Sequence, residues 1–337
     1  MPLKIAKTAF ILLTFALFIF SIWFALEYYA PQKMLPEKIF FEVDKGKGIK
    51  SIAQDLKERG VIKRTWPFLV GYQLFFSPKS LKAGEYAFSS PVLTKDVLKA
   101  LTEGKIYLHP LTIPEGLTGK EIAQLFPSLG FCEEEEMLKA FAETEAISSW
   151  DKKAQNLEGY LFPETYYIAK GTPPKEIVQS MVAEFKSVFN EEWQRRANEI
   201  RMTIREVVTL ASLIEKETSL PQEKKFVSTV FHNRLKRGMK LDCDPTIIYI
   251  LKQKGLFEGR LRSKDLRLDS PYNTYLYSGL PPSPICNPGK ESLEAALYPA
   301  KENFLYFVSK NDGSHLFSLT FKEHQVAVRK YHTKNRR

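Results

Sequence analysis

The chain opens with a long apolar segment. Residues 9–26, AFILLTFALFIFSIWFAL, contain no charged side chain, and a run of about 18 apolar residues approaches the length that crosses the hydrocarbon core of a bilayer. Lys4 and Lys7 precede it, and EYYAPQ follows without a small-x-small cleavage site, which favours an uncleaved anchor over a cleaved signal peptide. We expect residues 1–30 to form a cytoplasmic stub and a transmembrane helix, with the rest of the chain outside the cytoplasm.

Beyond a proline-bounded linker around Pro31 to Pro36, the pattern changes to short elements. IFFEV at residues 39–43 predicts a strand, and the spacing of Ile49, Ile52 and Leu56 predicts a helix. Further patterns predict a helix at 66–75, a strand at 85–88 and a helix at 94–101. This order of elements over residues 38–108 resembles LysM-like modules, a family of glycan-binding folds.

The second half of the chain reads as mostly helical. Apolar spacing predicts helices at 133–150, 174–197 and 205–219, whereas the aromatic segment 157–168 is broken by Gly159 and Pro163 and predicts a loop or a short strand pair. We expect a connecting helical region at 109–205 and a mixed α/β catalytic domain at 206–330. The overall class is therefore α+β.

The composition and charge of the chain limit the classes of binding partner that it suits. The 337 residues are 44% hydrophobic and 13% aromatic, with a formal net charge of +10, which suits nucleic acid, anionic lipid or cell-wall polymers. The basic residues are scattered, with no Arg-rich helix, RNP-type motif or zinc-finger spacing, so nucleic-acid binding is not predicted. Neither GxxxxGK[ST] nor a convincing GxGxxG occurs, and we expect no nucleotide cofactor.

Cysteine and histidine usage gives no metal motif. Cys132, Cys243 and Cys286 form no CxxC, and we expect small buried side chains, with a Cys243–Cys286 pair as the alternative if the exported chain is oxidised. The five histidines lack HExxH or another compact ligand spacing, so no metal site is predicted. No serine lies in a GxSxG motif, which marks the nucleophile of many serine hydrolases. The sequence therefore does not single out a Ser-His-Asp triad.

Two carboxylates form the main chemical candidate. Glu215 and Glu217 lie near the C-terminal end of the predicted helix REVVTLASLIEKETS, where the helix dipole disfavours negative charge and raises a carboxyl pKa. Residues two apart point to different sides of a helix, so one of them is expected to enter a given cleft. Both lie comparably far from the apolar side of the helix, and periodicity does not choose between them.

Several segments of the chain, in the same order, carry a second resemblance to a known family. The relevant stretches are LEGYLFPETYY at 157–167, the Glu215 helix, VFHNRLKRGMKLDCDPTIIY at 230–249, SPYNTYLYSGLPPSPICNPG at 270–289 and LYFVSKNDGSHLFS at 305–318. Together they resemble the YceG-like, or MltG, family of endolytic murein transglycosylases. The anchor and the LysM-like module also fit that layout.

The resemblance implies roles for individual residues. It matches Glu215 to the catalytic glutamate and makes Glu217 a supporting group or an alternative catalyst. It implies a cleft lined by Glu158, Tyr160, Asn233, Asp244, Thr246, Tyr272, Asn273 and Thr274. These would bind sugar hydroxyls and amides or hold the cleft loops in shape, and Asp244 and Asn273 could be turn residues. His315 is expected in a strand that borders the site.

The implied activity is a lyase reaction. Such an enzyme cleaves the MurNAc–GlcNAc bond inside a glycan strand, leaves a 1,6-anhydro-MurNAc end, and needs no cofactor. The expected partners are peptidoglycan and the cytoplasmic membrane, and the resemblance adds peptidoglycan synthases. Two alternatives stay open, a non-catalytic wall-binding scaffold and a hydrolase of the stem peptides.

Overall fold

The computed structural model describes residues 2–31 and 38–332, so most of the predicted linker lies outside the described residues. The chain is of mixed α+β class and forms two compact units. The first comprises Met1–Pro110 with Tyr167–Lys170, and the second comprises Leu111–Tyr166 with Gly171–Arg337.

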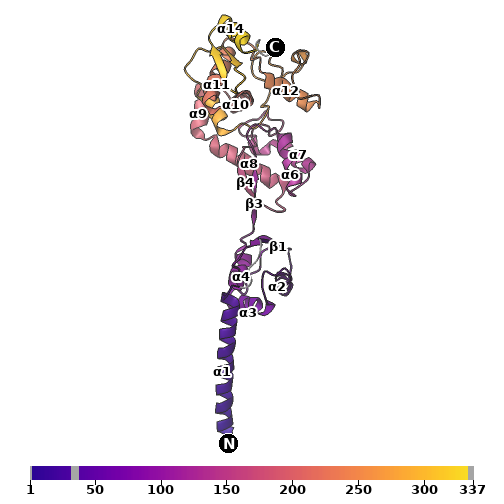
Figure 1. Ribbon diagram of the computed structural model, residues 1–337, viewed down its shortest axis with the longest axis vertical. Helices are drawn as coiled ribbons and strands as arrows, with labels where there is room; N and C mark the ends of the chain where they lie inside the picture. The colour runs from indigo at the N-terminus through magenta and orange to yellow at the C-terminus, as the bar shows by residue number, and fades with distance from the viewer. Residues whose placement is uncertain (1, 32–37, 333–337) are drawn as a thin grey trace. The chain divides into compact units, whose positions relative to one another are not determined.

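The first unit begins with a long helix, α1 (Pro2–Tyr29) (Figure 1). The small module that follows consists of β1 (Ile39–Val43), α2 (Ile49–Glu58), α3 (Thr65–Phe75), β2 (Gly84–Phe88) and α4 (Thr94–Glu103). β1 and β2 pair antiparallel, with Phe41 opposite Tyr86. The predicted strands and helices of this module are confirmed, each within two residues of the expected bounds.

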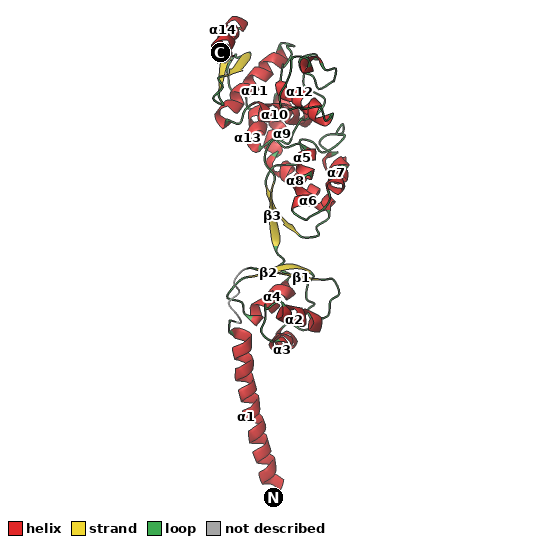
Figure 2. Ribbon diagram, turned by 45° about the vertical axis from the view of Figure 1, so that its right-hand side comes forward, coloured by secondary structure: helices red, strands yellow, loops and turns green. Residues whose placement is uncertain are grey.

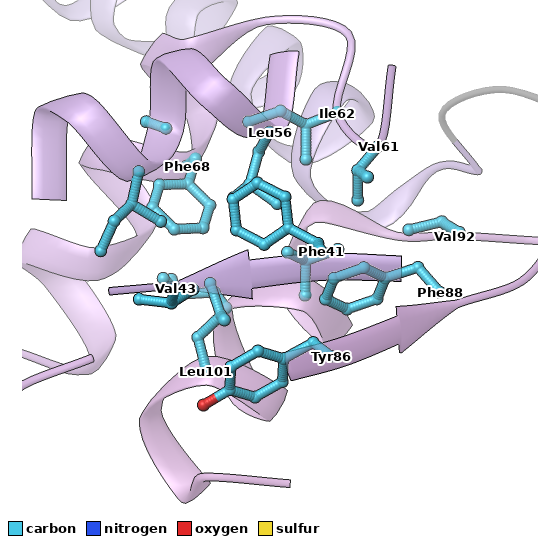
Figure 3. Close-up of a cluster of buried hydrophobic side chains, with 14 of the residues drawn as sticks. Phe41, Val43, Leu56, Val61, Ile62, Phe68, Tyr86, Phe88, Val92 and Leu101 are labelled. Atoms are coloured by element: carbon cyan, nitrogen blue, oxygen red, sulfur yellow. The ribbon is translucent and has the colours of Figure 1, made fainter. Parts of the chain in front are cut away.

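The module is built around an apolar core (Figure 3). Phe41 and Val43, two residues apart on β1, are both buried, as the alternation of a strand requires. Leu56 of α2, Phe68 of α3 and Leu101 of α4 are fully buried against them. Burying each such side chain stabilises the fold by roughly 1.5–3 kcal/mol, so a module of this size has a core of its own.

The helix α1 is apolar along its length and joins that core at its C-terminal end. Ile5–Tyr29 is long and apolar enough to cross a membrane. Phe24 and Tyr28 are buried against the module, where α1 packs on α3 and α4. Gly71 of α3 lets the helices approach, because a Cβ there would overlap the ring of Tyr28.

The chain passes between the units along β3 (Leu108–Thr112) and β4 (Thr165–Ala169), which pair with each other. Figure 2 shows that the second unit is mostly helical. Its remaining elements are α5 (Gly119–Ala123), α6 (Leu125–Ser128), α7 (Glu134–Ala142), η1 (Thr144–Ile147), α8 (Pro174–Val188), α9 (Glu191–Glu199), α10 (Ile204–Glu217), α11 (Pro221–Lys236), α12 (Asp244–Gln253), η2 (Asp265–Arg267), α13 (Lys290–Leu297), β5 (Tyr306–Ser309), β6 (His315–Ser318) and α14 (Phe321–His332).

Two predicted helices are shorter than expected. The helix predicted at 174–197 is broken into α8 and α9, because Asn190 accepts a hydrogen bond from the Trp193 amide (3.1 Å) and caps a new helix. The helix predicted at 133–150 ends at Ala142 and gives way to the 3₁₀ turn η1. The helix predicted at 205–219 is confirmed as α10, which begins with a capping box formed by Thr203 and Glu206.

Candidate active site

A cavity of about 390 Å³ lies at the C-terminal end of α10. Five parts of the second unit contribute to it: α10 and α11, the turn into α12, the loop that carries Tyr275, the β5–β6 hairpin and α14. The lining residues are Glu217, Arg234, Leu241, Asp242, Asp244, Tyr275, Tyr306, Phe307, Val308, Ser309, His315, Phe321 and His324. Carboxylates, one arginine and several aromatic rings thus share one space, and aromatic rings suit the apolar faces of sugars.

Glu217 is the last residue of α10 and lines this cavity. Its pKa is raised to about 7, chiefly because burial disfavours the charged form and also because of the negative charge of Asp244. A hydrogen bond with the Cys243 thiol and the positive charge of Arg234 act in the opposite direction. At neutral pH such a carboxyl is populated in both forms, as acid and base catalysis requires.

Asp244 lies beside Glu217 at the first turn of α12. Its Oδ1 accepts a hydrogen bond from the Tyr275 hydroxyl, and burial together with this bond raises the pKa of Tyr275 far above its usual value. Tyr275 therefore stays a neutral donor that fixes the Asp244 carboxylate. Asp244 is thus held where its charge keeps the pKa of Glu217 high.

Two histidines complete the cavity wall. The Glu223 carboxylate accepts from the His315 amide (2.9 Å) and lies 2.7 Å from His315 Nδ1, so the imidazole of β6 is held by α11. His324 of α14 stacks on Tyr306, and burial followed by the charge of Arg234 lowers its pKa. The expectation that His315 lies in a strand is confirmed, and this strand borders the cavity.

Glu215 is not among the residues that line this cavity, because it points into a different environment. Its Oε2 accepts from the Ser292 hydroxyl (2.6 Å) and from the Gly289 amide (3.1 Å). Lys224 Nζ lies 3.3 Å from the same oxygen, and only 4% of the Lys224 side chain and 8% of the Glu215 side chain are exposed. Three donors contact this carboxylate. Such an arrangement is typical of a structural ion pair.

Five of the other expected cleft residues hold the fold together. The Tyr160 hydroxyl donates to Asp151 Oδ2 (2.8 Å), and Asn233 Nδ2 donates to the Phe304 carbonyl (2.9 Å). Three more are buried and bonded to nearby backbone or to one another, namely Thr246, Asn273 and Thr274. For these positions the structure favours the role of holding the loops in shape.

Glu158 and Tyr272 lie apart from the Glu217 cavity. Tyr272 pairs its hydroxyl with that of Ser283 (2.5 Å). Glu158 borders a smaller cavity of about 270 Å³ and accepts from the Gly119 amide (3.0 Å) and from Asn287 Nδ2 (3.0 Å). Burial raises the pKa of Glu158 to about 8. Of the residues expected in one cleft, the structure brings together Glu217 and Asp244.

The pKa of Glu158 predicts a pH dependence of stability. In the folded chain this carboxyl holds its proton up to about pH 8, whereas an unfolded Glu releases it near 4.3. Between these values the folded state binds more protons, so stability falls as pH rises. We expect the melting temperature of the wild type to fall more steeply from pH 5 to 8 than that of Glu158→Gln. Parallel melting curves would contradict this expectation.

Several cavity residues were absent from the sequence expectations. Tyr275 directly follows the expected Tyr272-Asn273-Thr274 segment, and Arg234 directly follows Asn233. Others lie on β5 and α14, where Phe321 and His324 are three residues apart and hence on one side of the helix. For α14, this helical spacing is the sequence signal that could have indicated the cavity residues. For β5 there is no such signal, because alternation in so short a strand does not distinguish residues of a cavity wall from residues of the core.

The cysteines are unpaired in the structure. Cys243 and Cys286 are buried free thiols, as expected for small buried side chains, and Cys132 is partly exposed. Burial raises the pKa of Cys243 and of Cys286 well above the ordinary thiol value. Across residues 2–31 and 38–332, no group of three or more His, Cys, Asp or Glu side chains is arranged to hold a metal ion.

Comparison with known proteins identifies the family. The sequence profile of the YceG-like family matches residues 41–330. The chain belongs to the YceG-like family. The match covers the small module, both connecting strands and the whole Glu217 cavity, and thus extends well beyond the motifs of the second half.

Two relatives of this YceG-like chain carry the same name. A Bacillus subtilis (strain 168) protein named endolytic murein transglycosylase is 32% identical over 305 residues, covering 86% of this chain and 83% of that protein. A Streptococcus pneumoniae (serotype 2, strain D39) protein of the same name is 30% identical over 295 residues, and the match spans 53% of its length. A crystal structure of a YceG-like protein from Listeria monocytogenes is 33% identical, with a TM-score of 0.58 over 86% of this chain and 99% of that one.

Proposed function

We propose that this YceG-like protein is an endolytic murein transglycosylase and that Glu217 is its acid/base. The observation that carries the proposal is the position of Glu217 in an aromatic-walled cavity with a pKa raised to about 7. The name shared by the relatives supplies the substrate class, a peptidoglycan glycan strand. The structure thereby favours the alternative catalyst over Glu215, which the family resemblance had preferred.

The lyase reaction can run on this single carboxyl. Neutral Glu217 donates its proton to the glycosidic oxygen as the bond from MurNAc C1 to the GlcNAc O4 breaks. The carboxylate then accepts the proton of the MurNAc C6 hydroxyl, whose oxygen bonds to C1 and forms the 1,6-anhydro ring. The proton is returned to Glu217, no water is consumed, and no second carboxylate is needed, in contrast to ordinary glycosidases.

The direct test is the product. Purified glycan strands incubated with the full-length protein in detergent should yield fragments with 1,6-anhydro-MurNAc ends, detected by mass spectrometry. A wall-binding scaffold would release no fragments. A stem-peptide hydrolase would cut cross-links and leave the glycan ends unchanged. Either of these results would reject the proposed activity.

A pH dependence follows from the same carboxyl. The first step needs neutral Glu217, so we expect the rate to fall as pH rises through about 7. Asp244 raises that pKa, so Asp244→Asn should move the alkaline limb of the rate profile to lower pH. Tyr275→Phe, which removes the hydroxyl bonded to Asp244 while leaving its charge, is the matched variant and should move the limb less. A limb unmoved by Asp244→Asn would contradict the role of Asp244.

The apolar helix α1 supports a membrane location. We propose that it anchors the chain in the cytoplasmic membrane with the small module and the second unit on the outer side, where peptidoglycan is exposed. An enzyme held there meets strands close to where they are made, and we propose peptidoglycan synthases as partners on this ground. The order β1, α2, α3, β2 with paired strands supports the LysM-like assignment of the small module.

A further inference from the structure

The helix α3 of the small module has an unusual outer side. Its sequence, TWPFLVGYQLF, contains no charged residue. The inner side, with Phe68 and Gly71, is buried in the module and against α1. The outer side, hereafter the α3 face, consists of Trp66, Leu69, Val70, Gln73 and Leu74, which follow the i, i+3, i+4, i+7, i+8 pattern of one side of a helix.

The C-terminal end of the α3 face is exposed and includes a large apolar side chain. Leu74 is 63% exposed, and the other apolar members are partly buried by the module. The other two helices of the module have charged outer sides, for example Lys50 and Lys57 on α2 and Lys95 and Lys99 on α4. A surface helix that has no charged side chain and exposes large apolar side chains, here Leu74 and the neighbouring Phe75 (54% exposed), indicates contact with a further apolar phase.

The position of α1 identifies that phase. The Trp66 ring lies 4.5 Å from Trp23 and 5.5 Å from Phe20, near the C-terminal end of the apolar run of α1. Ile5–Tyr29 contains 25 residues, which at 1.5 Å each is about 37 Å of helix against a hydrocarbon core of about 30 Å. The hydrocarbon core takes about 20 of these 25 residues, so the last turns of α1 reach the lipid headgroups. Phe20 and Trp23, with Trp66 beside them, lie just inside that boundary, close to the level where Trp and Tyr concentrate in membrane proteins.

Charge at the two ends of α3 fits the same location. Lys63 and Arg64 precede the helix and Lys79 follows it, and all three are exposed. Basic side chains that flank an apolar segment interact favourably with anionic lipid headgroups. The guanidinium of Arg64 also lies 5.6 Å from the Trp23 ring, so one flank is tied to the anchor itself.

We propose that the α3 face rests in the interfacial layer of the bilayer that α1 crosses. The small module would then have two attachments to lipid, one that spans the membrane and one that lies on its surface. Free rotation of the module about the anchor would be lost, and its charged sides would face water. This inference depends on α1 as an anchor and is independent of the reaction at Glu217.

The test uses the full-length chain in vesicles of phosphatidylcholine and phosphatidylglycerol at high lipid-to-protein ratio. A nitroxide label is placed at Gln73→Cys on the α3 face and, as the matched control, at Gln54→Cys, an exposed glutamine on α2. Both variants carry Cys132→Ser, since the other two cysteines are buried. A label at Leu13→Cys, exposed on α1, reports insertion of the anchor.

The readout is the ratio of collisions with oxygen, which dissolves in lipid, to collisions with a water-soluble nickel chelate. We expect the ratio at Gln73 to approach that at Leu13 and to exceed that at Gln54 severalfold, and Leu74→Glu in the Gln73→Cys chain should lower it. Equal ratios at Gln73 and Gln54 would overturn the proposal. So would low collision rates with both reagents at Gln73, because another protein chain would then cover the face. A water-exposed Leu13 would overturn it together with the anchor.

Discussion

Glu217→Gln is expected to lower the rate of 1,6-anhydro end formation by roughly 10²–10⁴-fold, the usual contribution of a general acid or base. Glutamine keeps the size of the side chain but can neither donate the acid proton nor regenerate it. The measurement is the initial rate of fragment release from glycan strands, with anhydro ends identified by mass spectrometry. The loss should be in kcat, because the transferred proton acts in the transition state.

The melting temperature of Glu217→Gln shows whether a loss of activity comes from the missing carboxyl group or from unfolding. In the wild type at pH 8, most Glu217 side chains carry a partly buried negative charge, because the pKa is about 7. A neutral glutamine removes this charge, so the melting temperature at pH 8 should not fall. Glu217→Gln that melts early and is inactive would leave the loss of rate explained by unfolding, and unchanged activity would reject Glu217 as the acid/base.

Glu215→Gln is the matched variant two residues away. Its side chain contacts Lys224, Ser292 and the Gly289 amide and lies outside the cavity lining. We expect lower thermal stability but anhydro products at a near-normal rate per folded molecule, assayed well below the melting temperature. An inactive but folded Glu215→Gln, beside an active Glu217→Gln, would restore the assignment that the family resemblance preferred.

Local patterns were sufficient to predict the elements of the small module. β1 alternates buried and exposed residues, and α2 has a clear apolar side, so both were predictable from spacing. Breaks between helices were harder. Asn190 looks like an ordinary helical residue until its side chain is seen to accept from the Trp193 amide. Caps of this kind depend on a single rotamer and not on a periodic pattern.

The catalytic candidate shows a different limit. Helical spacing could place Glu215 and Glu217 at one helix end but could not choose between them, since each lies similarly far from the apolar side. What separates them is long-range: Lys224 of α11 and Ser292 of α13 surround Glu215, whereas Asp244 and Tyr275 surround the Glu217 side. Tertiary packing determines the environment of each carboxyl group. The helix dipole alone acts on the pKa of both in the same direction and does not distinguish them.

The helix dipole was also not the main cause of the raised pKa. The sequence argument expected the C-terminal position to disfavour charge, and the pKa of Glu217 is raised, but burial is the largest cause. The cavity that Glu217 lines is also bordered by the β5–β6 hairpin and α14, elements from the last third of the second unit. The direction of the pKa shift of Glu217 was therefore predictable from its position at the end of α10. The size of the shift depends on the tertiary structure around the side chain.

Lys224→Met is expected to destabilise the protein by about 3–5 kcal/mol, the cost of removing one partner of a buried ion pair. The Lys224 side chain is 4% exposed and lies 3.3 Å from Glu215, with Glu115 (3.7 Å) and Glu291 (3.8 Å) further away. Methionine fills the space but leaves the Glu215 carboxylate buried without a cation. Urea unfolding at pH 7 measures the loss, and the double variant Lys224→Met/Glu215→Gln should recover much of it.

Lys225→Met is the control, because the neighbouring lysine forms a shorter but exposed pair. Lys225 Nζ lies 2.8 Å from Glu294, yet the two side chains are 51% and 41% exposed, and exposed pairs contribute about 0–1 kcal/mol. Equal losses for the two lysine variants would show that Glu215 is solvated. In that case it would again be a candidate acid beside Glu217, since the donors around it are the reason for assigning it a structural role.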